Sequence, residues 1–197
     1  MLMARAATRI APRTSFGPGA LLTPANAVTA SRAAATPFLV LVVTASGASW
    51  LAAGLWAVLA LTDGLDGFIA RRQGATRSGA FLDPLADKLL VLGAMGALVA
   101  TGLMWWVPVG LIAGREVAIS LYRARAGRRG VSIPARPSAK AKTLIQDIAV
   151  GLALIPPLAS RHTWAVGVAL WVAVVLTLTS GVQYLLDARR AGDVGAL

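Results

Sequence analysis

Half of the acidic side chains in this chain lie in one short, otherwise apolar segment. The 197-residue sequence has eight acidic residues, and four of them fall between residues 62 and 89, namely Asp63, Asp66, Asp83 and Asp87. Asp63 and Asp66 are three residues apart, and Asp83 and Asp87 are four apart, so each pair would lie on one face of a helix. A short loop that joins the two helices as an antiparallel pair would bring the two carboxylate pairs opposite each other.

Four converging carboxylates predict a site for a divalent metal ion. An aspartate near the middle of a bilayer costs roughly 2.5–3.5 kcal/mol, so four together need a compensating positive charge. Carboxylate oxygens suit hard ions such as Mg²⁺ or Mn²⁺, and this segment has no His or Cys that would favour zinc. The small residues Gly67, Ala70 and Gly79 would let a bulky ligand approach the helix backbone closely. Arg71 supplies a cation that can meet a phosphate.

Two other uses of the aspartates are open. They could form ion pairs inside the membrane with Lys88, Arg71 and Arg72, or they could line a pathway for ions or protons. The acids outnumber these basic partners, and ion pairing would leave the small residues unexplained. A pathway would need acids distributed through the depth of the bundle, whereas these acids gather at one end.

The composition predicts an integral membrane protein. Hydrophobic residues make up 57% of the chain, charged residues 14%, and the mean hydropathy is +0.70, which excludes a soluble domain. Apolar stretches of about twenty residues can cross a ~30 Å hydrocarbon core as helices. We expect an all-α, polytopic membrane protein whose six transmembrane helices enclose a polar cavity that faces the cytoplasm. The expected spans are 31–46, 49–70, 80–103, 106–124, 142–160 and 163–186.

Two proline positions qualify these spans. Pro37 lies near the start of the first span and weakens the prediction of a helix there. Pro156 and Pro157 are expected to kink or end the fifth helix.

Outside the membrane domain, which we place at 24–190, we expect a basic N-terminal tail at 1–23 and a C-terminal tail at 191–197.

The basic residues predict the orientation in the membrane. Of the 19 lysines and arginines, only Arg161 falls in a connection on one side, and most of the others lie in tails and connections on the opposite side. The positive-inside rule therefore places both termini, and the aspartates, on the cytoplasmic face of the membrane. The net charge of +11 favours anionic lipid headgroups rather than nucleic acid, because no soluble basic domain is present.

The spacing of the aspartates resembles the signature of a known family. Asp63-x-x-Asp66-Gly67-x-x-Ala70-Arg71, then seven residues, then Gly79-x-x-x-Asp83-x-x-x-Asp87, is similar to the motif of the CDP-alcohol phosphatidyltransferases. The resemblance implies six helices around a site for two Mg²⁺ or Mn²⁺ ions, and a family-level expectation of a homodimer. It implies that Asp63, Asp66 and Asp83 bind metal, and that Asp87 both touches metal and acts as the general base. It also implies contacts of the CDP part of the donor with Gly67, Ala70, Arg71, Thr76 and Gly79.

Three further motifs contain polar and basic residues at or near the expected spans. They are Asn26-Ala-Val-Thr29-Ala-Ser-Arg32, Ala113-Gly-Arg115-Glu116-Val-Ala-Ile-Ser120 and Ser138-Ala-Lys140-Ala-Lys142-Thr143. They resemble motifs of the bacterial members of that family that use glycerol 3-phosphate. The resemblance implies that Asn26 and Thr29 contact the CDP-lipid. It also implies four residues that hold the phosphate of the acceptor, namely Arg32, Arg115, Lys140 and Lys142.

Other roles for these cations are open. Arg115 could instead be a structural partner of Glu116 or Asp147, since an arginine in an apolar helix needs a partner. The cations could also contact anionic lipid. From the resemblance we expect an enzyme that moves a phosphatidyl group from CDP-diacylglycerol to glycerol 3-phosphate and releases CMP. Phosphatidylglycerol and inositol phosphate are the rival acceptors, and a cation transporter is the rival outside this class.

Overall fold

Seven helices make up the part of the chain that the structure describes. The computed structural model describes residues 24–73, 77–128 and 138–194, and it describes only the backbone at 24–25, 63–73, 77–83, 124, 126–128, 138–140 and 188–194. The helices are α1 (Pro24–Ser46), α2 (Trp50–Gln73), α3 (Arg77–Ala100), α4 (Trp106–Arg128), α5 (Ser138–Leu154), α6 (Pro156–Arg161) and α7 (Thr163–Val194). No strand occurs among these residues, so the expected all-α class is confirmed.

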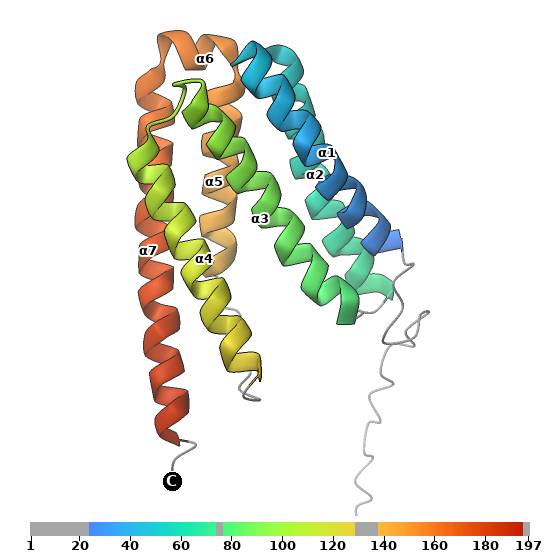
Figure 1. Ribbon diagram of the computed structural model, residues 1–197, viewed down its shortest axis with the longest axis vertical. Coiled ribbons are helices and arrows are strands. Elements are labelled where there is room, and N and C mark those ends of the chain that lie inside the picture. Colours follow the sequence, from blue (N-terminus) through green and yellow to red (C-terminus); the bar gives the residue numbers. More distant parts are fainter. Residues whose placement is uncertain (1–23, 74–76, 129–137, 195–197) are drawn as a thin grey trace, which may run out of the picture.

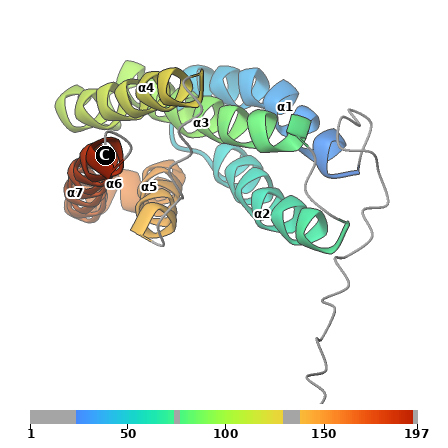
Figure 2. The ribbon, with the colours of Figure 1, turned by 90° about the horizontal axis from the view of Figure 1, so that it is seen from below.

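The long helices form two layers. Helices α1, α3 and α4 lie in one layer and α2, α5 and α7 in the other, while α6 lies across one end (Figure 2). Successive long helices run in opposite directions (Figure 1). The C-terminal ends of α2, α4 and α7 therefore lie at the same end of the molecule as the N-terminal ends of α1, α3 and α5. We call this the site end, and we call the opposite end, which carries α6, the turn end.

Small residues let the helices of the core approach closely. A Cβ on Gly93 of α3 would lie 3.4 Å from Cγ2 of Thr36 in α1, and a Cβ on Gly151 of α5 would lie 3.5 Å from Nε1 of Trp56 in α2. Around these contacts the buried side chains are apolar, with Leu39, Met95 and Leu98 among those fully shielded from solvent. Close packing of this kind holds helices together where the interior of the bundle and the lipid around it are both apolar.

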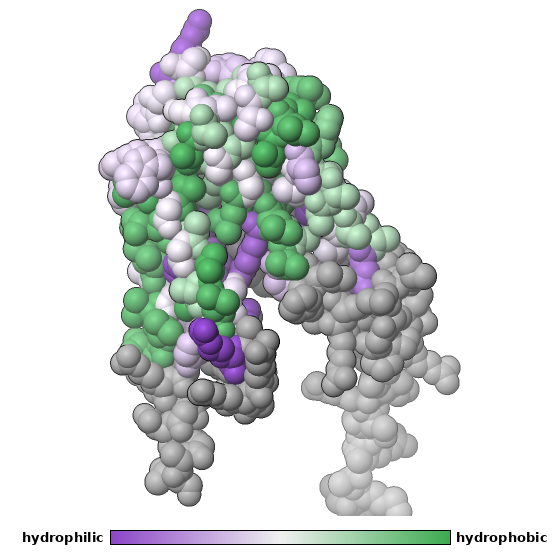
Figure 3. Space-filling view, in the orientation of Figure 1, coloured by the Kyte–Doolittle hydropathy of each residue, from purple (hydrophilic) through white to green (hydrophobic). Residues whose placement is uncertain are grey.

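The outer surface of the bundle is apolar as well. Large hydrophobic side chains are exposed on the long helices, including Leu41, Leu61, Val117, Leu144 and Val175. Apolar residues cover much of one face of the molecule (Figure 3). A soluble protein rarely exposes apolar surface on this scale, so these helices fit a membrane protein. Within the described residues, two helices are long and apolar enough to cross a membrane, Asn26–Ser46 and Thr163–Asp187, and Trp50–Thr62 is a shorter apolar helix.

The prolines act differently in α1 and α5. The helix α1 continues through Pro37, so the expected weakness of the first span was wrong. The Thr36 hydroxyl donates a hydrogen bond of 2.9 Å to the Arg32 carbonyl one turn earlier, next to the position where proline has no N–H to offer. At the other site the expectation is confirmed, because α5 ends at Leu154 and Pro156 begins the short helix α6.

Glycines make tight turns at the turn end. Gly47 follows α1 with φ of 62°, and Gly102 follows α3 with φ of 74°, both in the left-handed region that glycine adopts without strain. After α3 the Gly102 N–H donates to the Val99 carbonyl at 3.0 Å, and the Leu103 N–H donates to the Leu98 carbonyl at 2.8 Å. This pair of bonds is the Schellman motif, which satisfies the last carbonyls of a helix.

The chain ends bear on the expected domain boundaries. The basic tail at 1–23 lies outside the described residues. At the other end, the backbone of α7 stays helical to Val194 and so runs into the expected tail at 191–197.

Candidate active site

The backbone places the aspartates in two consecutive helices. Asp63 and Asp66 belong to the C-terminal part of α2, and Asp83 and Asp87 belong to α3. The side chains of Asp63, Asp66 and Asp83 lie outside the described part, whereas Asp87 is described and half-buried. Among the described side chains no group of three could hold a metal ion, and this part contains only one of the four aspartates. The metal site therefore stays a prediction.

Several other predicted site residues also lie outside the described part. The backbone of α2 contains Gly67, Ala70 and Arg71, and that of α3 contains Gly79, but nothing is described of their surroundings. Thr76 falls between the described ranges, and the side chain of Lys140 is not described. Their predicted contacts with the donor and acceptor stay predictions.

The buried carboxylate of Glu116, near the middle of α4, contacts three cationic side chains. Glu116 Oε1 accepts a hydrogen bond from Arg115 Nη1 at 2.9 Å and one from Lys142 Nζ, while Lys88 Nζ lies 3.6 Å from Glu116 Oε2. Lys88 also donates to the Ser120 hydroxyl. We call Lys88, Arg115, Glu116 and Lys142 the Glu116 cluster. The sequence resemblance implies a shared role for Arg115 and Lys142, and the structure brings both side chains to the carboxylate of Glu116.

Four helices position the Glu116 cluster. Lys88 comes from α3, Arg115 and Glu116 from α4, and Lys142 from α5. From α7, the Ser180 hydroxyl accepts a hydrogen bond of 2.9 Å from Arg115 Nη2. Hydrophilic side chains lie where the molecule is hollowed, between α4, α5 and α7 on one side and α1, α2 and α3 on the other (Figure 3). Since Lys88 directly follows Asp87 in α3, the cluster begins one residue from the predicted general base.

The cluster carries excess positive charge in an apolar environment. Three cations surround one carboxylate, which leaves a net charge of about +2 if all four groups are ionised. The side chain of Glu116 is 7% exposed, that of Lys142 10% and that of Arg115 11%. Isolated charges at such positions are costly, so each needs a partner of opposite sign. An anionic ligand would compensate the charge that Glu116 leaves over.

Arg115 retains an unused donor. Its Nε is buried and has no hydrogen-bond partner among the described residues. The arginine side chain lies against Gly181 of α7, where an added Cβ would be 2.9 Å from Nε and 3.3 Å from Cγ. Gly181 therefore provides the space that Arg115 occupies. A glycine within an apolar helix was the one signal in the sequence for this contact.

The first acceptor motif forms a separate buried polar face. Asn26, Thr29 and Arg32 follow one another at three-residue spacing in α1, so they share a face of the helix. All three are buried, and Arg32 is among the largest fully buried side chains of the protein. The helix α1 packs against α2 and α3, the two helices that carry the aspartates.

The structure also bears on the alternatives for the cations. The pairing of Arg115 with Glu116, one of the two structural partners expected for this arginine, is present at 2.9 Å. Lys88, which could have paired with the aspartates, is held by Glu116 and Ser120 among the described residues. Sequence reasoning missed that Lys88 and Lys142 share the carboxylate of Glu116, because their meeting depends on three helices.

The comparison with known families decides the class of the protein. The family model for CDP-alcohol phosphatidyltransferase matches residues 22–179. This chain belongs to the CDP-alcohol phosphatidyltransferase family. The resemblance drawn from the aspartate spacing is thereby confirmed, as is the expectation of an enzyme.

Curated CDP-alcohol phosphatidyltransferases resemble the chain over most of its length. A protein of Mycobacterium tuberculosis (strain H37Rv) named probable phosphatidylglycerophosphate synthase is 40% identical over 180 residues, which cover 88% of this chain and 84% of the relative. A protein of Escherichia coli (strain K12) named CDP-diacylglycerol–glycerol-3-phosphate 3-phosphatidyltransferase is 42% identical over 164 residues, which cover 78% of this chain and 87% of the relative. A protein of Shigella flexneri with the same name has the same identity and coverage.

Proposed function

We propose that this chain transfers the phosphatidyl group of CDP-diacylglycerol to glycerol 3-phosphate, forming phosphatidylglycerophosphate and CMP. Membership of the family and the names of its relatives support this reaction. The structural observation that carries the choice of acceptor is the Glu116 cluster. An acceptor with its own phosphate needs cations beside the metal site, whereas a neutral alcohol does not.

The predicted metal site fits the chemistry of the four aspartates. Carboxylates alone form a donor set for hard ions, so Asp63, Asp66, Asp83 and Asp87 would hold two Mg²⁺ or Mn²⁺ ions. Bound there, the ions would neutralise charge on the diphosphate of the donor and on the departing CMP. The helical placement of the aspartates in α2 and α3 supports this proposal.

The protein side chains accept the proton of the acceptor and bind the two substrates. Asp87 accepts the proton of the acceptor hydroxyl as the oxygen attacks the β-phosphorus of the donor. Gly67, Ala70, Arg71, Thr76 and Gly79 contact the CDP group, and Asn26 and Thr29 on the buried face of α1 extend that site. Arg32, Arg115, Lys140 and Lys142 hold the acceptor phosphate. Holding both reactants in one orientation reduces the entropic part of the barrier.

The proposed arrangement in the membrane follows from charge and helix length. Six spans cross the bilayer, with α5 and α6 together forming the fifth, and the site end faces the cytoplasm with both termini. Basic residues concentrate in the connections and tails at that end, which supports this orientation in a bacterial plasma membrane. A homodimer is the family-level expectation. With 32 residues, α7 is about 48 Å long and exceeds the ~30 Å core.

An acceptor panel tests the reaction. Purified full-length protein would be given CDP-diacylglycerol with glycerol 3-phosphate, phosphatidylglycerol, inositol phosphate or serine, and CMP release would be measured with and without Mg²⁺ or Mn²⁺. We expect metal-dependent release with glycerol 3-phosphate and little with the others. No release with any acceptor would exclude the reaction class, and release only with another acceptor would reassign the substrate. Movement of labelled cations across vesicles without CMP release would favour a transporter.

A further inference from the structure

Lys88 is the outermost cation of the Glu116 cluster. Its side chain is 31% exposed, compared with 11% for Arg115 and 10% for Lys142. The two inner cations share one oxygen of Glu116, and Lys88 faces the other oxygen. Lys88 is therefore the cation that a ligand from solvent can reach with the least displacement of protein groups.

The contacts of Lys88 leave capacity for a ligand. Its ammonium donates to Ser120, and its distance of 3.6 Å to Glu116 Oε2 is an ion pair longer than a hydrogen bond. An ammonium group has three N–H donors, so a second strong acceptor fits beside Ser120. Glu116 already compensates Arg115 and Lys142 at close range, so the surplus positive charge of the cluster is least compensated at Lys88.

The position of Lys88 in the sequence links two parts of the chemistry. It follows Asp87 directly in α3, so their Cα atoms are about 3.8 Å apart. Consecutive helical residues point about 100° apart, which lets Asp87 and Lys88 serve neighbouring sites. A small acceptor must present its hydroxyl to the base and its phosphate to the cations at the same time. Among the cations of the cluster, only Lys88 shares a helix with the aspartates.

We propose that Lys88 is a further acceptor-binding residue, whose ammonium holds the phosphate of the acceptor while Asp87 receives the hydroxyl proton. This inference rests on the proposed function and adds a residue that the sequence motifs did not assign to the acceptor. Lys88 thereby sets the separation between the reacting hydroxyl and the phosphate that the site accepts. An acceptor without a phosphate gains nothing from Lys88.

Steady-state kinetics of Lys88 variants test this role. In the full-length protein, Lys88→Gln removes the charge and keeps a hydrogen-bond donor for Ser120, and Lys88→Met is a second uncharged variant in case the first is unstable. Loss of one charge-assisted hydrogen bond should raise the KM for glycerol 3-phosphate roughly 10- to 100-fold. The KM for CDP-diacylglycerol should stay unchanged. Lys88→Arg keeps the charge and should recover most of the affinity for the acceptor.

Two control variants separate binding from structure and from general charge. Ser120→Ala removes the hydrogen bond between Lys88 and α4 but leaves the ammonium. It should lower the melting temperature and raise the acceptor KM much less than Lys88→Gln does. Arg125→Gln removes an exposed charge from α4 and should leave both KM values unchanged. Competitive inhibition by inorganic phosphate should weaken in Lys88→Gln and not in either control.

The outcomes distinguish this inference from the proposed function. An active wild-type protein whose Lys88→Gln variant keeps its acceptor KM would overturn the role of Lys88 alone. Equal increases of acceptor KM in Ser120→Ala and Lys88→Gln would also overturn it, because they would show that Lys88 acts by tying α3 to α4. If the wild-type protein releases no CMP with glycerol 3-phosphate, the proposed function fails, and the inference that rests on it fails too.

Discussion

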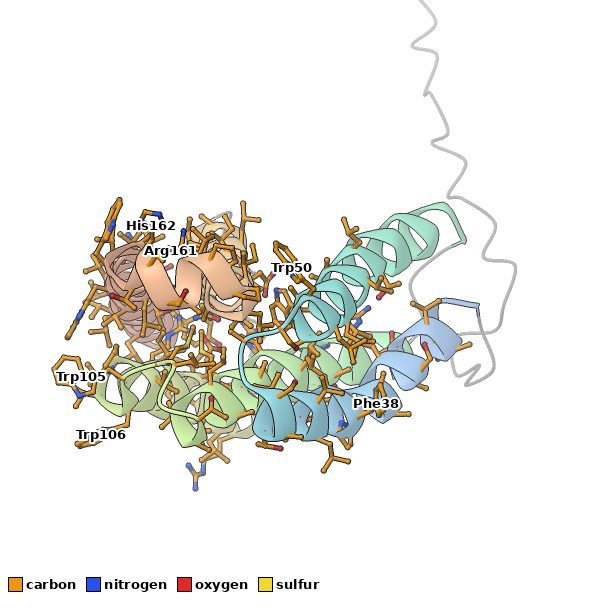
Figure 4. The ribbon with its side chains drawn as sticks, turned by 90° about the horizontal axis from the view of Figure 1, so that it is seen from above. Phe38, Trp50, Trp105, Trp106, Arg161 and His162 are labelled. Carbon is orange, nitrogen blue, oxygen red and sulfur yellow. The ribbon has the colours of Figure 1, made fainter. Side chains whose placement is uncertain are left out.

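The helices are held together by different kinds of contact at the two ends of the bundle. At the turn end, glycine-capped turns and the short helix α6 connect helices that meet over apolar side chains. Towards the site end, the helices meet over charged and hydroxylic side chains that come from α3, α4, α5 and α7. Trp105, Trp106, Arg161 and His162 lie at the turn end (Figure 4). His162, the only histidine, is exposed there, far along the chain from the aspartates.

This difference separates stability from chemistry along the length of the same helices. Apolar contacts at the turn end are non-directional and tolerate small adjustments. The Glu116 cluster requires each charge to be matched, because a lone buried charge is costly. We therefore expect substitutions at the turn end to change stability alone, and substitutions towards the site end to change activity as well.

The largest effect is expected for the predicted general base. Asp87→Asn keeps the size of the side chain but cannot accept the proton of the acceptor, so kcat should fall roughly 10²- to 10⁴-fold. Release of CMP from CDP-diacylglycerol measures this. Thermal unfolding of the same variant separates a loss of chemistry from a loss of stability. Full activity in this variant would exclude Asp87 as the base.

The second effect tests the charge matching in the Glu116 cluster. Glu116→Gln leaves Lys88, Arg115 and Lys142 without their shared carboxylate, and breaking a buried pair costs about 3–5 kcal/mol. Thermal unfolding in detergent should show a clear loss of stability together with a loss of activity. The matched change at the turn end is Leu98→Ala, whose cavity should cost about 2–5 kcal/mol. Glycerol 3-phosphate KM should stay unchanged in that variant.

The third effect concerns the space beside Arg115. Gly181→Ala places a methyl group 2.9 Å from Arg115 Nε, so the guanidinium must move or α7 must shift, at a cost of about 1–3 kcal/mol. The acceptor KM should rise, because Arg115 leaves its position beside Glu116. Gly167→Ala is the control on the same helix, since no atom lies within 4 Å of the added group. Equal kinetics of the two variants would show that Arg115 does not need this position.

The smallest effect is expected at the turn after α3. Gly102→Ala places a side chain at φ of 74°, which costs roughly 1–2 kcal/mol in an L-residue. Gly110→Ala in α4, where the added group meets no atom within 4 Å, is the control. We expect a lower melting temperature only in the first variant and full activity in both. A loss of activity in Gly102→Ala without a loss of stability would contradict the separation of the two ends.

Much of this molecule could be predicted from local patterns in the sequence. Apolar stretches indicated the helices, Pro156 indicated the break after α5, and the aspartate spacing indicated the family. These features depend on residues that are close together in the chain. Pro37 misled the prediction, because α1 continues through it as one helix from Pro24 to Ser46.

The arrangement around Glu116 could not be predicted in the same way. Lys88 and Lys142 are 54 residues apart, since 142 minus 88 is 54, and they meet only because α3, α4 and α5 pack together. The sequence indicated that Arg115 needs a partner and named Glu116 as one choice. It held no signal that one carboxylate serves three cations, or that Gly181 makes room for one of them.

The contact between α2 and α5 also gives the protein an intrinsic optical probe. Of the six tryptophans, Trp56 alone is buried in the described part of the chain, and Trp50, Trp105, Trp106, Trp164 and Trp171 are exposed on the outer surface. Its indole donates to the Asp147 carbonyl and lies against Gly151. Replacing the five outer tryptophans with phenylalanine would leave one fluorophore between the aspartate-bearing helices and the rest of the bundle. Its emission and its accessibility to a quencher would then report in real time whether these two groups of helices separate when substrates bind.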